Sequence, residues 1–255
     1  MPPFPQSVVP YNSGMETISG KLAIVTGGTR GIGRAIAENL LRAGASVAIC
    51  GRSQASVEAA RSELAAAGGG KLFAAVADVT DADAVDRFFK QVDEAFGGLD
   101  ILVNNAGAGV FRKVGEMTVE EWHRTIDLNL TGPFYCTRAA LPRFARRGGG
   151  FVVNISSLAG KNPFSGGAAY NASKFGLNGF SEALMLDHRH DNVRVSYIMP
   201  GSVATEFSDP ARRTGDSSWK IAPEDVADVV EMVLRIPART MVSRVEMRPS
   251  RPQKG

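Results

Sequence analysis

Two side chains that could move a proton lie four positions apart in the segment Tyr170-Asn-Ala-Ser-Lys174. A helix places residues at this spacing on one face, about 6 Å apart along its axis. A free phenol has a pKa of about 10, and a neighbouring ammonium stabilises the phenolate and brings that pKa towards neutral pH. Unrelated helix residues also show this spacing, so the surroundings must support the pair. With that support, the pair predicts a general acid and base.

A hydroxyl group lies upstream of this pair. Ser156 and Ser157 follow the apolar stretch 151–155, and Ser157 is thirteen residues before Tyr170. If that stretch is a parallel strand, the serines lie at its carboxyl end, where ligands bind in open α/β sheets. A hydroxyl at this edge can hydrogen-bond a substrate oxygen on which charge develops.

A glycine-rich segment, Thr26-Gly-Gly-Thr-Arg-Gly-Ile-Gly33, joins a predicted strand to a predicted helix. Its spacing is Gly27-x-x-x-Gly31-x-Gly33. Glycines let the backbone turn tightly and approach a pyrophosphate, and the helix N-terminus supplies N–H donors and a positive dipole. A tight turn with packing glycines is the alternative, but the position between strand and helix favours a phosphate turn.

Strand-like and helix-like stretches alternate from Gly20 onward. Short apolar runs predict strands at 21–26, 46–50, 72–77, 99–104, 151–156, 193–199 and 241–247. Helices are predicted at 31–43, 53–67, 81–96, from Thr118 onward, 168–188 and 223–234. This alternation predicts one α/β domain over 20–250, doubly wound (Rossmann-type), with a parallel sheet of about seven strands flanked by helices.

Three segments do not fit the alternation. Residues 1–19 hold four prolines and lack a basic start followed by an apolar run, so we expect a flexible leader rather than a secretory signal. Residues 251–255 are expected to form a tail. The irregular stretch 206–222 is rich in Ser, Asp, Arg and Gly, and its length predicts a substrate loop.

Several short segments, taken in order, resemble the motifs of the short-chain dehydrogenase/reductase family, classical type. They are the glycine turn, Asp78-Val79, Asn104-Asn-Ala-Gly107, Asn129 within Leu128-Asn-Leu130, Ser156-Ser157, Tyr170–Lys174, and Pro200-Gly-Ser-Val-Ala-Thr205. The resemblance covers about residues 20–234. Each motif is modest alone, and their shared order is specific.

The resemblance implies an oxidoreductase that interconverts a secondary alcohol and a ketone by hydride transfer. Tyr170 would be the general acid in reduction and the general base in oxidation. Ser157 would bind the substrate oxygen, and the interval of thirteen residues selects it over Ser156. Lys174 would tune Tyr170 and hold the nicotinamide ribose. Asn129 would fix a water in the proton relay.

The resemblance also implies a path for the cofactor. Its residues are Gly27, Thr29, Arg30, Gly31, Ile32 and Gly33 in the turn; Arg52 and Ser53 after the second strand; Asp78 and Val79 at the adenine; Asn105, Ala106 and Gly107 along the adenosine ribose; Tyr170 and Lys174; and Pro200, Gly201, Val203 and Thr205 near the carboxamide and a phosphate. No metal is implied, because His188 and His190 do not face each other on a helix.

The residues after the second strand indicate which nicotinamide is preferred. In NAD-selective members an acidic side chain there binds the ribose 2′-hydroxyl. This chain has Cys50-Gly-Arg-Ser53 instead, with no carboxylate. Arg52 and Arg30 could neutralise a 2′-phosphate, because a guanidinium matches a phosphate fork. Two surface arginines are the alternative. We therefore expect NADP(H) to be preferred, with NAD(H) possible.

Substrate identity is less defined. It would be set by the loop 206–222, by residues 108–111 and by the segment 158–167, which hold no obvious carboxylate anchor. The ending Met247-Arg-Pro-Ser-Arg-Pro252 differs from the glycine-rich ending of fatty-acid-synthesis reductases, which weakens a 3-oxoacyl thioester substrate. A catalytically inactive NADP(H) sensor would show a defect in the catalytic residues, and none is present. A sugar-nucleotide epimerase needs a larger C-terminal domain.

Composition and apolar patterning indicate which kinds of partner and setting to expect. A net charge of +3, with arginines among prolines and no interleaved aromatics in the C-terminal tail, does not indicate nucleic acid. No apolar run reaches the roughly 20 residues of a membrane helix. Two isolated cysteines suggest a reducing, cytoplasmic setting. The helix 168–188 is apolar nearly all round (Phe175, Leu177, Phe180, Leu184, Leu186), which predicts a homodimer or homotetramer.

Overall fold

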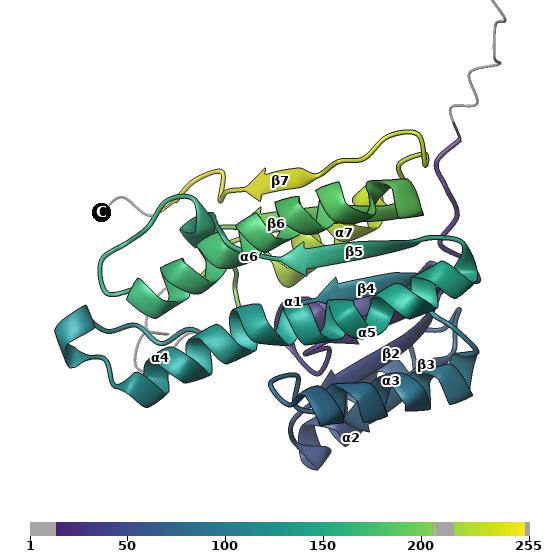
Figure 1. The fold of residues 1–255 in the computed structure, drawn as a ribbon, viewed down its shortest axis with the longest axis horizontal. Helices are drawn as coiled ribbons and strands as arrows, with labels where there is room; N and C mark the ends of the chain where they lie inside the picture. The colour runs from purple at the N-terminus through teal and green to yellow at the C-terminus, as the bar shows by residue number, and fades with distance from the viewer. Residues whose placement is uncertain (1–13, 206, 208–216, 253–255) are drawn as a thin grey trace, which may run out of the picture.

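The computed structural model describes residues 14–205, 207 and 217–252, and its centre is a parallel β-sheet (Figure 1). The strands are β1 (Leu22–Thr26), β2 (Ser46–Gly51), β3 (Leu72–Val76), β4 (Ile101–Asn104), β5 (Gly150–Ile155), β6 (Val193–Pro200) and β7 (Arg244–Met247). Their order across the sheet is β3-β2-β1-β4-β5-β6-β7, and every neighbouring pair is parallel. This confirms the predicted doubly wound (Rossmann-type) α/β fold.

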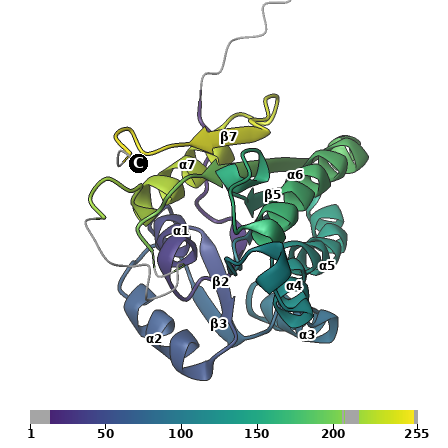
Figure 2. The same ribbon diagram turned by 90° about the vertical axis from the view of Figure 1, so that its left-hand side faces the viewer.

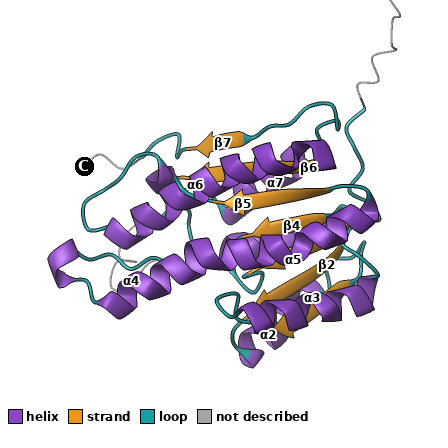
Figure 3. Ribbon diagram, viewed as in Figure 1, coloured by secondary structure: helices purple, strands orange, loops and turns teal. Residues whose placement is uncertain are grey.

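Helices cover both faces of the sheet, because parallel strands need crossover connections (Figure 3). They are α1 (Gly31–Arg42), α2 (Gln54–Leu64), α3 (Ala82–Phe96), α4 (Val119–Ile126), α5 (Gly132–Arg147), α6 (Ala168–His188) and α7 (Pro223–Arg235). Figure 2 shows α1, α2 and α7 on one side and α3, α5 and α6 on the other. The strands thus lie between two helical layers.

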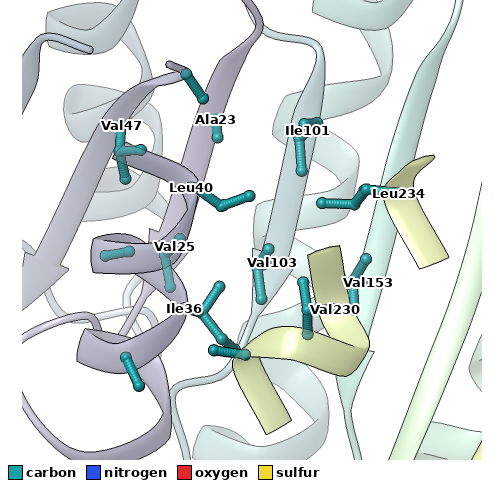
Figure 4. Close-up of a cluster of buried hydrophobic side chains, with 14 of the residues drawn as sticks. Ala23, Val25, Ile36, Leu40, Val47, Ile101, Val103, Val153, Val230 and Leu234 are labelled. Carbon is teal, nitrogen blue, oxygen red and sulfur yellow. The ribbon is translucent and has the colours of Figure 1, made fainter. Parts of the chain in front are cut away.

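Two apolar cores result, one on each face of the sheet. In the first, Ile36 and Leu40 of α1 and Val230 of α7 pack onto β1 and β4 (Figure 4). Strand residues that point to opposite faces are both buried, as with Ile24 and Val25. That is why the central strands are continuous apolar runs rather than alternating ones.

The helix predicted from Thr118 onward contains a wider turn. Thr118 and Glu121 form a reciprocal capping box that starts α4. The chain continues through a π-helical turn, Asp127–Thr131, directly into α5. Single π-helical turns in α-helices are often found at functional sites, and this one contains Asn129.

Two predicted elements are shorter in the structure. The second helix was expected over 53–67, and α2 ends at Leu64 ahead of a glycine-rich turn. The last strand was expected over 241–247, and β7 begins only at Arg244. Here the Val195 amide donates to the Met241 sulfur at 3.3 Å. That contact replaces a backbone ladder bond, so regular pairing with β6 starts later.

Of the predicted leader, the structure describes residues 14–19. Ile18 is buried in the first core, and Glu16 lies 3.5 Å from Arg194 and accepts a hydrogen bond from the Ala238 amide. These contacts hold that part of the segment against the domain. Residues 1–13, and 206 and 208–216 of the predicted substrate loop, lie outside the described residues. No helix within the described residues combines the length and apolar character that a membrane span requires.

Candidate active site

One cavity of about 890 Å³ opens at the carboxyl ends of the strands. This is the edge where ligands bind in open α/β sheets. The predicted site residues that line it are Gly27, Thr29, Arg30, Gly31, Ile32, Arg52, Ser53, Asp78, Val79, Asn105, Ala106, Gly107, Ser157, Tyr170, Lys174, Pro200, Gly201, Val203 and Thr205. Gly33 and Asn129 are not among the residues that line the cavity.

The turn between β1 and α1 requires glycine at specific positions. Gly27 and Gly31 have φ values of +62° and +53°, in the left-handed region. A Cβ on Gly27 would also lie 2.9 Å from the Ala106 Cα. Gly33 lies behind the turn, where a Cβ would collide with the Gly27 carbonyl and the Asn105 side chain. Gly33 therefore permits close packing of α1 against the turn and the end of β4.

The end of β4 holds this turn in place. The Asn105 side-chain amide donates to the carbonyls of Thr26 (3.0 Å) and Gly27 (3.2 Å). The Thr26 hydroxyl accepts from the amides of Asn105 (3.0 Å) and Ala106 (3.1 Å). Asn105 thus braces the turn, which the expected packing against a ribose did not anticipate. Thr26 was not singled out from the sequence.

The opposite side of the turn meets the end of β2. A Cβ on Gly51 would lie 2.7 Å from the Thr29 methyl, so the Thr29 side chain packs closely against the Gly51 backbone. Arg30 follows Thr29 in the chain, and Arg52 follows Gly51. Both arginines are exposed and line the cavity. Asp78 also lines the wall, and its Oδ1 accepts from the Thr80 amide (3.0 Å) and hydroxyl (2.8 Å). The two cations and this fixed carboxylate line the same cavity.

The two serines after β5 have different partners. The buried Ser156 hydroxyl donates to the Asn178 side chain at 2.5 Å. The Ser157 hydroxyl accepts from the Ala159 amide at 3.1 Å and donates to the Pro200 carbonyl at 3.5 Å. Ser157 also lowers the pKa of the Tyr170 phenol in part, so it is the serine that interacts with the phenol.

Tyr170 and Lys174 lie together on α6, both nearly inaccessible to solvent. The Lys174 ammonium is 5.8 Å from the centre of the Tyr170 ring and donates to the Ile155 carbonyl at 2.9 Å. Burial raises the pKa of Tyr170 above its ordinary 10.0, and the hydrogen bond to Ser157 opposes this in part. Burial lowers the pKa of Lys174 from 10.5 to about 8. The sequence predicts a lowered pKa for the Tyr170 phenol, whereas in the protein without cofactor burial raises that pKa.

Asn129 lies behind the cavity wall, in the π-helical turn. Its Oδ1 accepts from the Ala108 amide at 2.9 Å. Its Nδ2 donates to the Ala108 carbonyl at 2.9 Å and to the Ser173 hydroxyl at 3.0 Å. Ser173 in turn donates to the Tyr170 carbonyl at 2.8 Å. The side chain of Asn129 therefore ties the loop after β4 to the helix that holds the phenol.

Part of the cavity lining was not predicted from the sequence. Asn162 and Lys220 come from the predicted substrate segments 158–167 and 206–222. Lining residues outside the predicted site residues and substrate segments include Cys50, Gly51, Ser56, Leu128, Ser202, Pro249 and Pro252. The last two belong to a stretch read as a solvated ending. The Gly201 amide donates to the Met247 carbonyl at 2.9 Å, which brings the residues after β7 to the cavity. No local pattern marks those prolines.

Cys50 and His188 show no sign of reactivity or metal binding. Cys50 is buried at the end of β2, and burial raises the pKa of its thiol to about 12, so it remains an unreactive thiol. His188 lies at the end of α6, with its Nδ1 2.8 Å from Asp191 Oδ2. Within the described residues, no group of three or more His, Cys, Asp or Glu side chains could hold a metal ion.

The fold and the glycine turn together define a dinucleotide-binding α/β protein. The first N–H groups of α1 have no partner within the helix and sit beside a turn that glycine keeps open. The cavity runs from this turn to Tyr170, which suits an extended dinucleotide with a reactive end at the phenol.

Comparison with known proteins gives the class more narrowly. A family model described as short chain dehydrogenase matches residues 21–216. Glycine betaine reductase ATRR of Emericella nidulans is 35% identical over 240 residues, which are 91% of this chain but 19% of that protein. An uncharacterized oxidoreductase of Staphylococcus aureus is 32% identical over 235 residues, 92% of this chain and 100% of that protein.

Two solved structures are similar throughout. An alcohol dehydrogenase from the archaeon Thermococcus sibiricus, complexed with 5-hydroxy-NADP, has a TM-score of 0.84 and 31% identity, covering 92% of this chain and 100% of that one. A metagenomic short-chain oxidoreductase in complex with NADP has a TM-score of 0.81 and 38% identity, covering 93% and 100%. The chain belongs to the short-chain dehydrogenase family of oxidoreductases.

Proposed function

We propose that this protein interconverts a secondary alcohol and a ketone with NADP(H), using Tyr170 as the general acid and base. One observation carries the proposal: the buried phenol of Tyr170 and the hydroxyl of Ser157 line the same cavity as the glycine turn. Bound NADP(H) supplies or accepts the hydride. The protein side chains must then orient the oxygen and move one proton.

In reduction, Tyr170 donates its proton to the carbonyl oxygen. Because burial raises its pKa, the phenol stays protonated at neutral pH and can act as an acid. Ser157 donates a hydrogen bond to the same oxygen as negative charge develops on it. In oxidation both transfers run in reverse, and the phenolate accepts the proton of the alcohol.

Lys174 and Asn129 support this transfer. The Lys174 ammonium lies close enough to the ring to stabilise the phenolate that reduction leaves behind. With a pKa of about 8, Lys174 can also pass a proton near neutral pH. Both N–H bonds of the Asn129 side chain are already used. We therefore assign the holding of a relay water to the backbone of the π-helical turn rather than to that side chain.

Selection of NADP(H) is assigned to Arg30 and Arg52. Their guanidiniums lie on the wall where the turn meets β2, and no carboxylate occupies residues 50–53. A 2′-phosphate there would receive charge-assisted hydrogen bonds, whereas a 2′-hydroxyl would not need them. The two similar structures hold NADP-type ligands, which supports the assignment.

Replacing Arg52 with aspartate is expected to weaken NADPH binding by about tenfold to a hundredfold, since a charge-assisted hydrogen bond is lost and repulsion is added. NADH binding should change little. Dissociation constants for both cofactors, measured by titration, test this result. Arg61→Asp, an exposed change on the same α2 region away from the cavity, is the control. An unchanged ratio of NADPH to NADH affinity in Arg52→Asp would remove Arg52 as the selector.

The direct test of the function is a panel of ketones and secondary alcohols assayed with NADPH and NADH in parallel. We expect consumption of NADPH with at least one ketone, and faster turnover with NADPH than with NADH. A 3-oxoacyl thioester belongs in the panel, because that narrower substrate class uses the same chemistry. Tight NADPH binding without turnover on any carbonyl would instead indicate a sensor.

We propose that the protein forms a homo-oligomer, because α6 carries exposed apolar side chains in addition to those that it buries. Leu177 and Leu184 are buried against the sheet side, whereas Phe175 and Leu186 are 46% and 59% exposed. Phe134 on the neighbouring α5 is also largely exposed and contacts Phe180 of α6. Large exposed apolar side chains on α6 and α5 favour burial against a second copy.

A further inference from the structure

Three phenylalanine rings surround the Tyr170 ring. Phe111 and Phe207 have ring centres 5.6 Å from that of Tyr170, and Phe164 lies at 6.4 Å. They come from three separate loops, after β4, β6 and β5, and all line the cavity. Any carbonyl that reaches the phenol must therefore place a substituent against these rings. We call Phe111, Phe164 and Phe207 the aromatic wall.

Two rings of the aromatic wall remain open to a ligand. Phe164 and Phe207 are 44% and 40% exposed, although large aromatic side chains usually bury most of their surface. Phe111 and Phe164 also contact each other, with centres 5.7 Å apart and planes inclined by 52°. The spacings fall in the range for edge-to-face and tilted aromatic pairs. An additional ring can extend this arrangement.

The charges of the cavity argue against a cationic substrate. Among its described lining residues, Asp78 is the one with a carboxylate, and its Oδ1 is held by Thr80. Lys174 and Lys220 add positive charge to the lining. A cation at the aromatic wall would thus lack a counter-ion and would be repelled. A neutral aromatic group gains the ring contacts without that penalty.

We propose that the substrate is an aryl ketone without a positive charge, whose carbonyl carbon bears an aromatic ring that stacks on the aromatic wall. This rests on the proposed function. The carbonyl carbon gains the hydride of the reduced cofactor, and the oxygen gains the proton of Tyr170. The products are a 1-arylalkanol and the oxidised cofactor, and solvent reprotonates the phenolate.

A saturated analogue gives the sharpest comparison. Acetophenone and cyclohexyl methyl ketone differ mainly in aromaticity, and an aromatic pair adds a gain beyond that from area alone. We expect kcat/KM with NADPH to be about two- to tenfold higher for acetophenone. Benzoylformate and a trimethylammonium-bearing methyl ketone provide an anionic and a cationic arm. Higher kcat/KM for the cationic ketone than for acetophenone would overturn the proposal, and higher kcat/KM for benzoylformate would support an aryl substrate that the positively charged lining attracts.

Phe164→Leu tests the aromatic wall, because it keeps an apolar side chain and removes the ring. We expect the preference for acetophenone over cyclohexyl methyl ketone to fall by about two- to tenfold, mostly through KM. Phe96→Leu is the matched control. Phe96 forms an aromatic pair with Phe73 at the same 6.4 Å spacing, and it does not line the cavity. An unchanged preference in Phe164→Leu would overturn the assignment.

A binding measurement distinguishes the proposed ligand class from the proposed function. Isothermal titration of acetophenone into the protein saturated with NADP+ reports binding at the aromatic wall without turnover, because the oxidised cofactor has no hydride to transfer to a ketone. Binding that Phe164→Leu weakens, in a protein that turns over no ketone, would support the ligand class and refute the proposed function. Turnover of ketones with no preference for the aryl member would support the function and refute the ligand class.

Discussion

Tyr170→Phe is expected to lower kcat for ketone reduction by about a hundredfold to ten-thousandfold, because it removes the proton donor. The phenyl ring that remains keeps its contacts with Phe111, Phe164 and Phe207. Binding of the cofactor at the glycine turn should persist, since that turn does not depend on the hydroxyl. The variant should therefore separate binding from chemistry.

Two measurements check this result. Single-turnover kinetics with NADPH gives the rate of the chemical step, and quenching of tryptophan fluorescence reports cofactor binding, since Trp219 lines the cavity. Tyr197→Phe is the control, because it removes a buried tyrosine hydroxyl that donates to Glu182 at 2.7 Å outside the cavity. If Tyr170→Phe reduced ketones at a near-normal rate, the phenol would not be the acid.

Lys174→Met is expected to abolish most turnover while making the protein more stable at pH 7. Lys174 is 4% exposed, and its pKa falls from 10.5 in the unfolded chain to about 8 in the fold. A shift of this size corresponds to about 3 kcal/mol of burial cost at neutral pH. Losing the charge-assisted hydrogen bond to Ile155 costs about 1.5 kcal/mol or more, so the net gain is at most about 1.5 kcal/mol.

The pH dependence of the free energy of unfolding shows whether the buried Lys174 ammonium carries this cost. Below pH about 8 both states carry the proton, and the cost of the buried charge is fully present. Between about 8 and 10.5 the unfolded chain binds more protons than the fold, so this group makes the free energy of unfolding rise with pH. In Lys174→Met that rise should be absent.

Urea unfolding at pH 7 and at high pH, for wild type and variant, tests the sign. Lys90→Met is the matched control, because Lys90 is an exposed residue of α3 and should shift neither the stability nor its pH dependence. A variant less stable than wild type at pH 7 would show that the hydrogen bond outweighs the burial of the charge. Turnover should fall in Lys174→Met because the ammonium is absent. A separate titration measures whether this variant still binds NADPH.

Local features of the chain were sufficient to predict the fold and to select residues that line one cavity. The apolar runs and the alternating helices predicted all seven strands and their parallel arrangement, because strands covered on both faces must be apolar throughout. The glycine turn and the Tyr170–Lys174 pair were visible because their function depends on neighbours within one turn. The resemblance to a family then ordered these motifs along one chain.

Apolar runs and residue spacing did not predict contacts between segments that are far apart in the sequence. The aromatic wall joins residues 111, 164 and 207 from three loops, and Pro249 reaches the cavity from the chain end. The direction of the Tyr170 pKa also depends on burial by the whole fold rather than on the lysine one turn away. Periodicity and spacing record a residue's own helix or strand, whereas burial and cavity shape arise only when separate elements pack together.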